Sequence, residues 1–317
     1  MKILVTGGAG FIGANLIGSL LDHPGVTLVR ALDNLSTGRL DNLAAYLHHP
    51  RFQLIQGDIR NENDCLGACS GIDAISHQAA LGSVPRSIRT PAVSHDVNVN
   101  GFVNILEAAR RHHIKRIVYA SSSSVYGDLQ ESPKVENRTG KVLSPYAATK
   151  ITNEVYAEAY SRNYDMQLLG FRYFNVFGPR QDPDGPYAAV IPLFIKAALR
   201  NQSPLINGDG TITRDFTPVA NVVQVNTKGL MTGKTTAFHE VLNVACGQTT
   251  SLGDLWQMIR ELAGSHAIPV YGQPRKGDIL ASTADIGKAV DFLGYQPETD
   301  LRKALRIAID YYKQTMD

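Results

Sequence analysis

The chain has 317 residues, of which 44% are hydrophobic and 19% charged, a mixture that excludes a disordered chain and a coiled coil. With 31 Lys and Arg against 29 Asp and Glu, the net charge is +2. The sequence therefore lacks the broad basic field by which proteins hold nucleic acid. At roughly 150 residues per domain, the length predicts two domains or one large one.

The three cysteines are too few and too scattered for a disulfide framework, and they fit the reducing cytoplasm. Cys65 and Cys69 lie four residues apart in an expected helix, where we interpret them as free thiols. The histidines do not have the spacing of a zinc site, so no metal is expected. Residues 3–21 carry no charge, which resembles a membrane span, but Gly7, Gly8, Gly10 and Gly13 interrupt them and favour a soluble protein.

The first half of the chain alternates short apolar runs with helical periodicity, which is the pattern of βαβ units around a parallel sheet. The predicted strands cover residues 2–5, 28–32, 52–56, 74–77, 116–120 and 168–172. The predicted helices cover residues 11–21, 65–69 (part of a short helix), 97–112 and 144–163. We therefore expect an α/β fold with a doubly wound parallel-sheet Rossmann domain.

From about residue 177 the pattern becomes less regular. Residues 178–187 contain three prolines and two aspartates and predict an ordered loop. Helices are predicted at 190–200, 220–231, 252–262 and 301–316, with a turn at 208–210 and a short strand near 214–216. We expect a smaller, partly interleaved α/β substrate lobe. The predicted domains are 1–176, to which part of 215–245 returns, and a lobe formed by 177–214 and 246–317.

A glycine motif, TGGAGFIG, follows the first strand and opens the first helix. Gly7, Gly10 and Gly13 permit a tight turn, close approach of the backbone to a pyrophosphate, and close helix–strand packing. The N–H groups of the helix N-terminus suit the phosphates. Asp33 stands 20 residues beyond Gly13, where its carboxylate would accept from ribose hydroxyls and repel a 2′-phosphate. This predicts NAD rather than NADP. The strand before the motif and the helix after it disfavour the alternative of a plain glycine-rich turn.

A second motif places Tyr146 and Lys150 one turn apart on a helix, so that they share a face. A neighbouring ammonium and an oxidised nicotinamide would favour the phenolate and lower the pKa of Tyr146 from its usual ~10. Such a group can take a proton from an alcohol. Hydroxyls of the serine run 121–124 can relay the proton or hold a carbonyl oxygen. A Tyr–Lys pair alone is usually a solvated helix face, but the glycine motif and the serine run favour catalysis.

The chain resembles, from end to end, the extended short-chain dehydrogenases/reductases, and among them the nucleotide-sugar epimerases and dehydratases. The motifs that carry this resemblance are TGGAGFIG, GDIR, HQAA, the serine run, SPYAATK, RYFNVFGPRQ and RKGD. The resemblance implies that the catalytic residues are Ser122, Tyr146 and Lys150. It implies cofactor contacts at Gly7, Gly10, Phe11, Ile12, Gly13, Asp33, Asn34, Ser36, Thr37, Gly38, Asp58, Ile59, Gln78, Ala79, Ala80, Ser121, Tyr146, Lys150 and Tyr173. It implies substrate contacts at Ser83, Ser122, Ser123, Ser124, Tyr146, Asn175, Ala189, Val190, Asn207, Arg214, Arg275, Asp278 and Ser282.

Within this family, Ser123 and Ser124 stand where sugar dehydratases carry an Asp-Glu pair, which favours 4-epimerisation over dehydration. Residues 82–87 and 181–185 resemble the branch that acts on N-acetylated UDP-hexoses. Ser282 stands where a Tyr narrows the sugar pocket of some enzymes restricted to non-acetylated sugars. The resemblance therefore implies NAD-dependent 4-epimerisation of UDP-hexoses through a transient 4-keto sugar, with UDP-N-acetylglucosamine and UDP-N-acetylgalactosamine preferred.

Several alternatives stay open at this point. They are 4-epimerisation of UDP-glucose or UDP-glucuronate, sugar dehydration, and a non-catalytic NAD-binding role on the same fold. The resemblance also implies a cytoplasmic homodimer, joined by the helices predicted at 97–112 and 144–163. Val103 and Ile151 are candidate apolar contacts there. Neither a nucleic-acid nor a membrane partner is expected.

Overall fold

The structure is a computed structural model that describes residues 1–184, 188–273 and 281–316. The chain divides into two compact units. The first unit comprises Met1–Gly127, Thr139–Arg172 and Val223–Leu242, and the second comprises Asp128–Arg138, Tyr173–Val222 and Asn243–Asp317. Sequence analysis assigns residues 128–138 to the first domain, whereas in the structure they group with the second unit.

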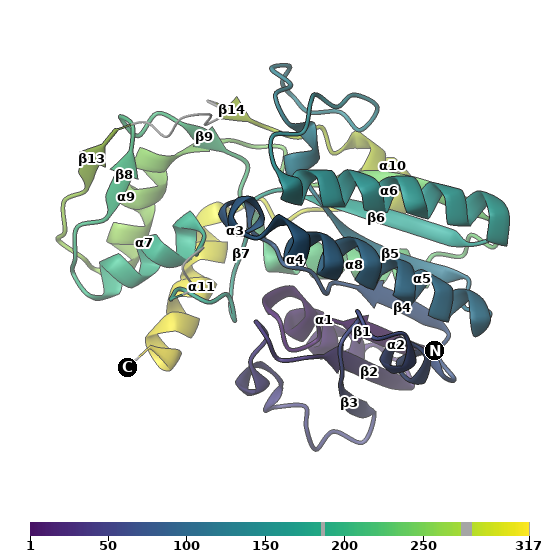
Figure 1. Ribbon diagram of the computed structural model, residues 1–317. Coiled ribbons are helices and arrows are strands. Elements are labelled where there is room, and N and C mark those ends of the chain that lie inside the picture. The colour runs from purple at the N-terminus through teal and green to yellow at the C-terminus, as the bar shows by residue number, and fades with distance from the viewer. Residues whose placement is uncertain (185–187, 274–280, 317) are drawn as a thin grey trace. The chain divides into compact units, whose positions relative to one another are not determined.

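The first unit is built on a seven-stranded sheet (Figure 1). In spatial order, its strands are β11 (Phe238–Val244), β6 (Gln167–Tyr173), β5 (Arg116–Ser122), β4 (Ala74–His77), β1 (Lys2–Thr6), β2 (Leu28–Asp33) and β3 (Phe52–Gln56). The four pairs from β3 to β5 are parallel. β11 also runs along β6, because Phe238 N–H donates to Met166 O at one end and Phe174 N–H to Val244 O at the other. The strand order reverses beside β1, which confirms the predicted doubly wound Rossmann fold.

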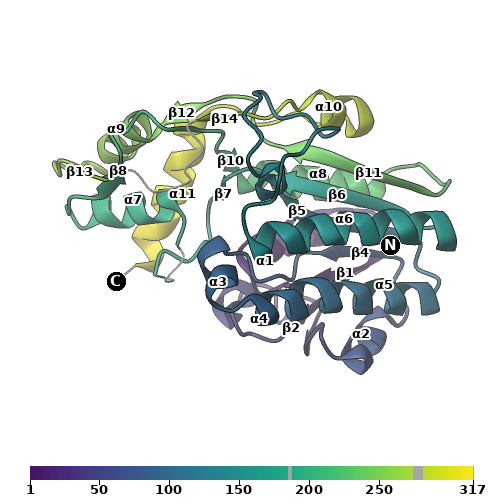
Figure 2. The same cartoon turned by 45° about the horizontal axis from the view of Figure 1, so that its top comes forward.

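Helices cover both faces of this sheet, and Figure 2 shows α5 and α6 side by side over one of them. That face carries α2 (Glu62–Cys69), α5 (Gly101–Arg111) and α6 (Pro145–Tyr164), and the opposite face carries α1 (Phe11–Asp22) and α8 (Val219–Met231). The alternation of side chains along β5 shows this division. Tyr119 contacts Phe102 of α5 at 5.1 Å between ring centroids, whereas Val118 lies against Gly229 of α8.

The helix predicted over 97–112 has a more complex form. The chain enters through α3 (Val84–Arg89) and α4 (Pro91–His95), continues through a π-helical turn, η2 (Asp96–Asn100), and only then becomes α5. Pro91 occupies the first turn of α4, where its missing N–H costs no helical hydrogen bond. Shorter 3₁₀ turns are η1 (Leu40–Leu43) and η3 (Ser123–Tyr126).

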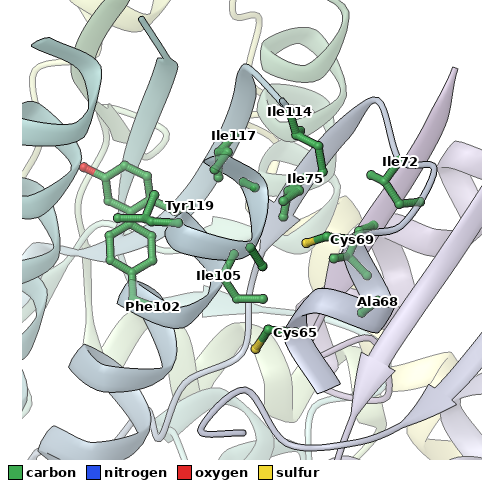
Figure 3. Close-up of a cluster of buried hydrophobic side chains, with 14 of the residues drawn as sticks. Cys65, Ala68, Cys69, Ile72, Ile75, Phe102, Ile105, Ile114, Ile117 and Tyr119 are labelled. Atoms are coloured by element: carbon green, nitrogen blue, oxygen red, sulfur yellow. The ribbon is translucent and has the colours of Figure 1, made fainter. Parts of the chain in front are cut away.

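An apolar core fills the space between the sheet and the helices α2 and α5 (Figure 3). The side chains of Phe102 and Ile105 from α5 meet those of Ile75 and Ile117 from the strands and both cysteines of α2. All three cysteines of the chain are free thiols. Burial raises the pKa of Cys65 and of Cys69 to about 12, so neither thiol ionises at neutral pH. Their role is packing.

The second unit packs three helices, α7 (Val190–Leu199), α9 (Leu252–Ala263) and α11 (Leu301–Thr315), around its own apolar core. Its remaining elements are β7 (Val176–Phe177), β8 (Leu205–Asn207), β9 (Thr213–Arg214), β10 (Thr217–Pro218), β12 (Thr250–Ser251), β13 (Val270–Gly272), β14 (Ala281–Ser282) and α10 (Gly287–Leu293). The single strand predicted near 214–216 is wrong. Two strands flank Asp215 and Phe216, because β9 pairs with β12 and β14 whereas β10 pairs with β7. Among the described residues, no helix has the length and apolar character that crossing a membrane requires.

Candidate active site

The first unit contains a cavity of about 390 Å³. Twelve of the predicted cofactor contacts line it: Gly7, Gly10, Asp33, Asn34, Ser36, Thr37, Gly38, Asp58, Ile59, Gln78, Ala79 and Ala80. The residues that sequence reasoning missed are Leu32, Gly57, Arg60, Leu81, Arg86, Val93 and Val97. Some of these residues could have been found by their nearness to predicted ones, since Arg60 lies two residues beyond Asp58 and Arg86 lies six residues beyond the HQAA motif.

The loop between β1 and α1 fits a pyrophosphate. Gly7 has φ +66°, in the left-handed region, and a Cβ on Gly13 would lie 2.2 Å from Gly7 O. Gly10 is the N-cap residue of α1, and the N-terminus of this helix receives no hydrogen bond from a capping side chain. Phe11 and Ile12 do not line the cavity, but they are the first two residues of α1 and contribute N–H groups of its N-terminus. Such N–H groups are the donors that phosphates accept from.

Two carboxylates flank this cavity. Asp33, 8% exposed, accepts from the N–H groups of Ala9 at 2.9 Å and Leu35 at 2.8 Å, one on each oxygen. Each oxygen keeps capacity for a ribose hydroxyl, and the charge opposes a 2′-phosphate. Asp58 accepts from Arg60 at 2.6 Å and from Asn34 at 2.8 Å. The Arg60 hydrogen bond holds the pKa of Asp58 well below its ordinary value.

The structure brings Ser122, Tyr146 and Lys150 together. Tyr146 lies in the first turn of α6, which Ser144 caps by accepting from Ala147 N–H at 3.2 Å. Lys150 is 1% exposed, and its Nζ donates to Ala120 O at 2.7 Å and lies 5.9 Å from the centroid of the Tyr146 ring. The Ser122 side chain, at the end of β5, lies next to the Tyr146 hydroxyl and lowers its pKa. The three groups thus form one cluster, in which Lys150 is buried and Ser122 and Tyr146 are half-buried.

Burial governs the protonation of this cluster. It raises the pKa of Tyr146, and the neighbouring Ser122 side chain offsets part of the rise. It lowers the pKa of Lys150 to about 8, against the charge of Glu154, which raises it. In the chain by itself, burial outweighs the effect of Ser122, and the predicted lowering of the pKa of Tyr146 stays a prediction. Lowering the pKa of Tyr146 requires the further positive charge of an oxidised nicotinamide.

Two hydroxyl side chains hold the main chain of Tyr146. Its N–H donates to Ser87 Oγ of α3 at 3.0 Å, and its carbonyl accepts from Thr149 Oγ1 at 2.7 Å. Asn98, in the π-helical turn, donates in turn to Thr149 Oγ1 at 3.1 Å. Sequence reasoning missed Ser87 and Asn98, because they lie far from Tyr146 along the chain and share no local pattern with it.

The remaining predicted serines have varied surroundings. The Ser121 hydroxyl donates to Glu154 at 2.5 Å, and Ser83 caps α3 by accepting from Arg86 N–H at 3.1 Å. Ser123 begins η3, and the buried Ser124 hydroxyl makes no hydrogen bond within the described residues. Such a hydroxyl has capacity for a polar ligand. Tyr173, the last residue of β6, groups with the second unit.

The second unit contains a cavity of about 490 Å³. The predicted substrate residues Asn175, Val190, Asn207 and Arg214 line it, together with apolar side chains that include Phe194. Ala189 is the N-cap residue of α7, directly before Val190.

Ser282 does not line this cavity, but β14 pairs with β9, so that its backbone stands opposite that of Arg214, which does. Arg275 and Asp278 lie outside the described residues. Within the part of the chain that the structure describes, no three His, Cys, Asp or Glu side chains are grouped as a metal would require.

Comparisons with known proteins agree with this geometry. The model of the NAD dependent epimerase/dehydratase family matches residues 3–245. The chain is 37% identical over 313 residues to a putative UDP-glucose 4-epimerase of Methanocaldococcus jannaschii, covering 98% of both. It superposes with a TM-score of 0.93 and 35% identity, over 99% of each chain, on a UDP-N-acetylglucosamine 4-epimerase of Methanobrevibacter ruminantium M1 in complex with UDP-N-acetylmuramic acid.

A second solved structure contains the cofactor. The UDP-glucuronic acid 4-epimerase of Bacillus cereus, in complex with UDP-glucuronic acid and NAD, gives a TM-score of 0.89 at 33% identity, over 99% of this chain and 100% of that one. The family and the NAD cofactor predicted from the sequence are confirmed. The protein belongs to the NAD-dependent epimerase/dehydratase family.

Proposed function

We propose that the protein is a 4-epimerase of UDP-hexoses that keeps NAD as its resident cofactor. The observation that carries the proposal is the cluster in which the Ser122 side chain lies next to the Tyr146 hydroxyl and Lys150 Nζ lies 5.9 Å from the centroid of the phenol ring. The names of the three relatives described above, each a 4-epimerase of a UDP-sugar, support the same reaction.

Each residue of the cluster has a proposed part in moving one proton. Tyr146 takes the proton of the C4 hydroxyl and later returns it. Ser122 donates to the same sugar oxygen and keeps it within reach of the phenol. Lys150, held by its bond to Ala120 O at 2.7 Å, favours the phenolate by its charge. Bound NAD supplies reversible acceptance of hydride, so the overall reaction inverts C4 without net oxidation.

Epimerisation is favoured over dehydration by the residues that follow Ser122. Elimination of water from the sugar needs an acid and a base of its own, and Ser123 and Ser124 have no carboxylate to supply them. A hydroxyl with its ordinary pKa exchanges protons poorly near neutral pH. The chain therefore has groups for the C4 proton and none at these positions for a second proton transfer.

We further propose that N-acetylated UDP-hexoses are the preferred substrates. The support is the small side chain of Ser282, whose backbone pairs with that of Arg214 at the cavity of the second unit. A serine leaves room for an acetamido group at C2, which a larger side chain would exclude. The solved UDP-N-acetylglucosamine 4-epimerase among the relatives supports the same preference.

The experiment is a substrate panel followed by proton NMR. Purified protein is incubated separately with UDP-N-acetylglucosamine, UDP-N-acetylgalactosamine, UDP-glucose, UDP-galactose and UDP-glucuronate. We expect each N-acetylated sugar to convert to its C4 epimer, with a higher kcat/KM than the other sugars. A 4-keto-6-deoxy product would identify a dehydratase instead. Conversion of UDP-glucose or UDP-glucuronate alone would retain the epimerase and refute the N-acetyl preference.

We also propose a homodimer joined through α5 and α6. The candidate contacts Val103 and Ile151 are half-buried in the single chain, and α6 also exposes Val155 (62%) and Tyr156 (39%) on its surface. A second copy would cover this apolar strip. Light scattering at micromolar concentration should give about twice the chain mass of 34.5 kDa, and a monomer would contradict the proposal.

A further inference from the structure

Asp215 is a buried carboxylate within the loop that follows β9. The residue has no exposed surface. Its carboxylate accepts main-chain N–H groups from Cys246 at 2.9 Å, Gly247 at 3.0 Å and Ala284 at 3.4 Å. Three donors from two distant segments thus converge on one side chain, which fixes the loop at this point. Burial raises the pKa of this carboxyl to about 6, and these N–H groups favour its charged form.

The main chain of Asp215 reaches two residues of the proposed substrate site. Its N–H donates to Ser282 O at 3.1 Å, and its carbonyl accepts from Asn175 Nδ2 at 2.9 Å. Its chain neighbour Arg214 lines the cavity of the second unit together with Asn175. One buried residue is therefore bonded, directly or through the chain, to three residues proposed to bind substrate.

Asn175 depends on this support. It is an exposed residue with φ +36°, a backbone conformation that residues other than glycine rarely adopt. An exposed amide would otherwise sample several rotamers, and a ligand that orders such a side chain loses affinity by doing so. The bond to Asp215 O removes that freedom in advance.

We propose that Asp215 is a positioning residue for UDP-sugar binding: its carboxylate anchors the loop that presents Arg214 and holds Asn175 and Ser282 in place. The inference rests on the proposed function, since it concerns the nucleotide-sugar side of that site. Asp215 need not touch the substrate. It acts through its neighbours, so its removal should weaken substrate binding more than the chemical step.

Asp215→Asn is the most selective substitution for testing this carboxylate. Asp215→Asn keeps the shape of the side chain but replaces one acceptor oxygen by an NH₂ group that faces main-chain donors. At least one N–H among Cys246, Gly247 and Ala284 then loses its acceptor. The loop should shift, and the positions of Arg214 and Asn175 should shift with it.

The test compares three proteins: wild type, Asp215→Asn and the control Asn221→Asp. Asn221 is also buried in the second unit and also holds a segment, with bonds to Glu298 N–H and O at 2.8 and 3.0 Å. It also donates to Cys246 Sγ at 3.4 Å, but none of these three bonds is made to Arg214, Asn175 or Ser282. Calorimetry with UDP, steady-state kinetics with each sugar of the panel, NAD content after acid extraction and the urea unfolding midpoint are measured for each. We expect Asp215→Asn to raise the Kd for UDP and the KM at least about tenfold, with kcat within about threefold and NAD content unchanged. The control Asn221→Asp should lower the urea unfolding midpoint without raising the Kd for UDP or the KM.

The outcomes separate the two proposals. Wild-type protein that binds no UDP would refute the proposed function. Wild-type protein that binds UDP while Asp215→Asn binds it equally well, or while the control loses equal affinity, would overturn the positioning role. If Asp215→Asn does not fold, Asp215→Ser, which keeps a small acceptor, replaces it.

Combined with Asn175→Gly, either variant should cost less affinity than the sum of the single changes, because both act on the same side chain. Additive losses would contradict the inference.

Discussion

Glu154 and Arg172 form a two-point ion pair inside the first unit, with Nε–Oε1 at 3.0 Å and Nη2–Oε2 at 2.7 Å. The side chains are 9% and 5% exposed, respectively. Glu154 lies one helical turn after Lys150, and its charge raises the pKa of that lysine. Burial dominates over this charge and lowers the pKa of Lys150 to about 8. The same carboxylate therefore pairs with Arg172 and acts on Lys150 by its charge.

Replacing Lys150 by Met should stabilise the NAD-free protein while removing turnover. Because the folded-state pKa of about 8 lies below the ordinary 10.5, the buried ammonium costs folding free energy that grows as pH falls from 10.5 through 8. At pH 7 this cost is about 3 kcal/mol. The urea midpoint of Lys150→Met should therefore exceed wild type at pH 7, and the gain should shrink toward pH 10. Lys115→Met, an exposed change, should show neither effect, and a destabilised Lys150→Met would contradict the account.

Replacing Tyr146 by Phe should lower kcat by a factor of about 10²–10⁴, the range that a general base contributes. Folding and NAD content should stay close to wild type, because the phenolic oxygen alone is lost. Tyr156→Phe, on the exposed face of the same helix, is the matched control and should keep full activity. Near-normal turnover by Tyr146→Phe would remove the proton-transfer role of this residue.

The cofactor recovered from purified protein should be NAD with little NADP. Asp33→Asn should raise the share of NADP, because an amide lacks the negative charge that repels a 2′-phosphate. Acid extraction and chromatography measure the ratio, and Asp41→Asn, on the surface of η1, is the control. Recovery of mainly NADP from the wild type would overturn the part given to Asp33.

Replacing Ser282 by Tyr should change substrate preference. A tyrosine ring would fill the space that the acetamido group needs and could not retreat within a packed wall. Turnover of the N-acetylated sugars should fall, while UDP-glucose and UDP-galactose should be spared. The quantity to measure is the ratio of kcat/KM between the two classes. An unchanged ratio would mean that Ser282 does not line the sugar pocket, and equal losses would indicate a disturbed second unit.

The sequence predicted the first six strands of the sheet because each is a short apolar run between helical patterns. It did not predict β11, in which Phe238–Val244 mixes polar with apolar residues and is half-buried over its first four positions. The strands of the second unit escaped prediction for another reason. Most are two residues long, and two residues cannot show a period. Long-range pairing, such as that of Arg214 with both Thr250 and Ser282, decides where such strands form.

Sequence reasoning located the site where motif and geometry coincide. The glycine motif predicts a tight turn in its own residues, and Tyr146 and Lys150 share one helix face by spacing alone. The supporting residues escaped it. Ser87 meets Tyr146 across 59 positions of sequence, and Asp215 meets Ala284 across 69. Contacts of that kind follow from tertiary packing, and no local pattern encodes them.

The place of β11 in the sheet has a consequence for synthesis of the chain. β11 is the last strand of the sheet to be made, and its N–H and C=O groups pair with β6, whose residues precede it by about 70 positions. Until residue 244 has left the ribosome, β6 presents an unpaired edge in which all seven residues are destined for burial. Such an edge is a template for pairing with other chains. A fragment cut at residue 176 should therefore aggregate, and nascent chains should need protection until the sheet closes.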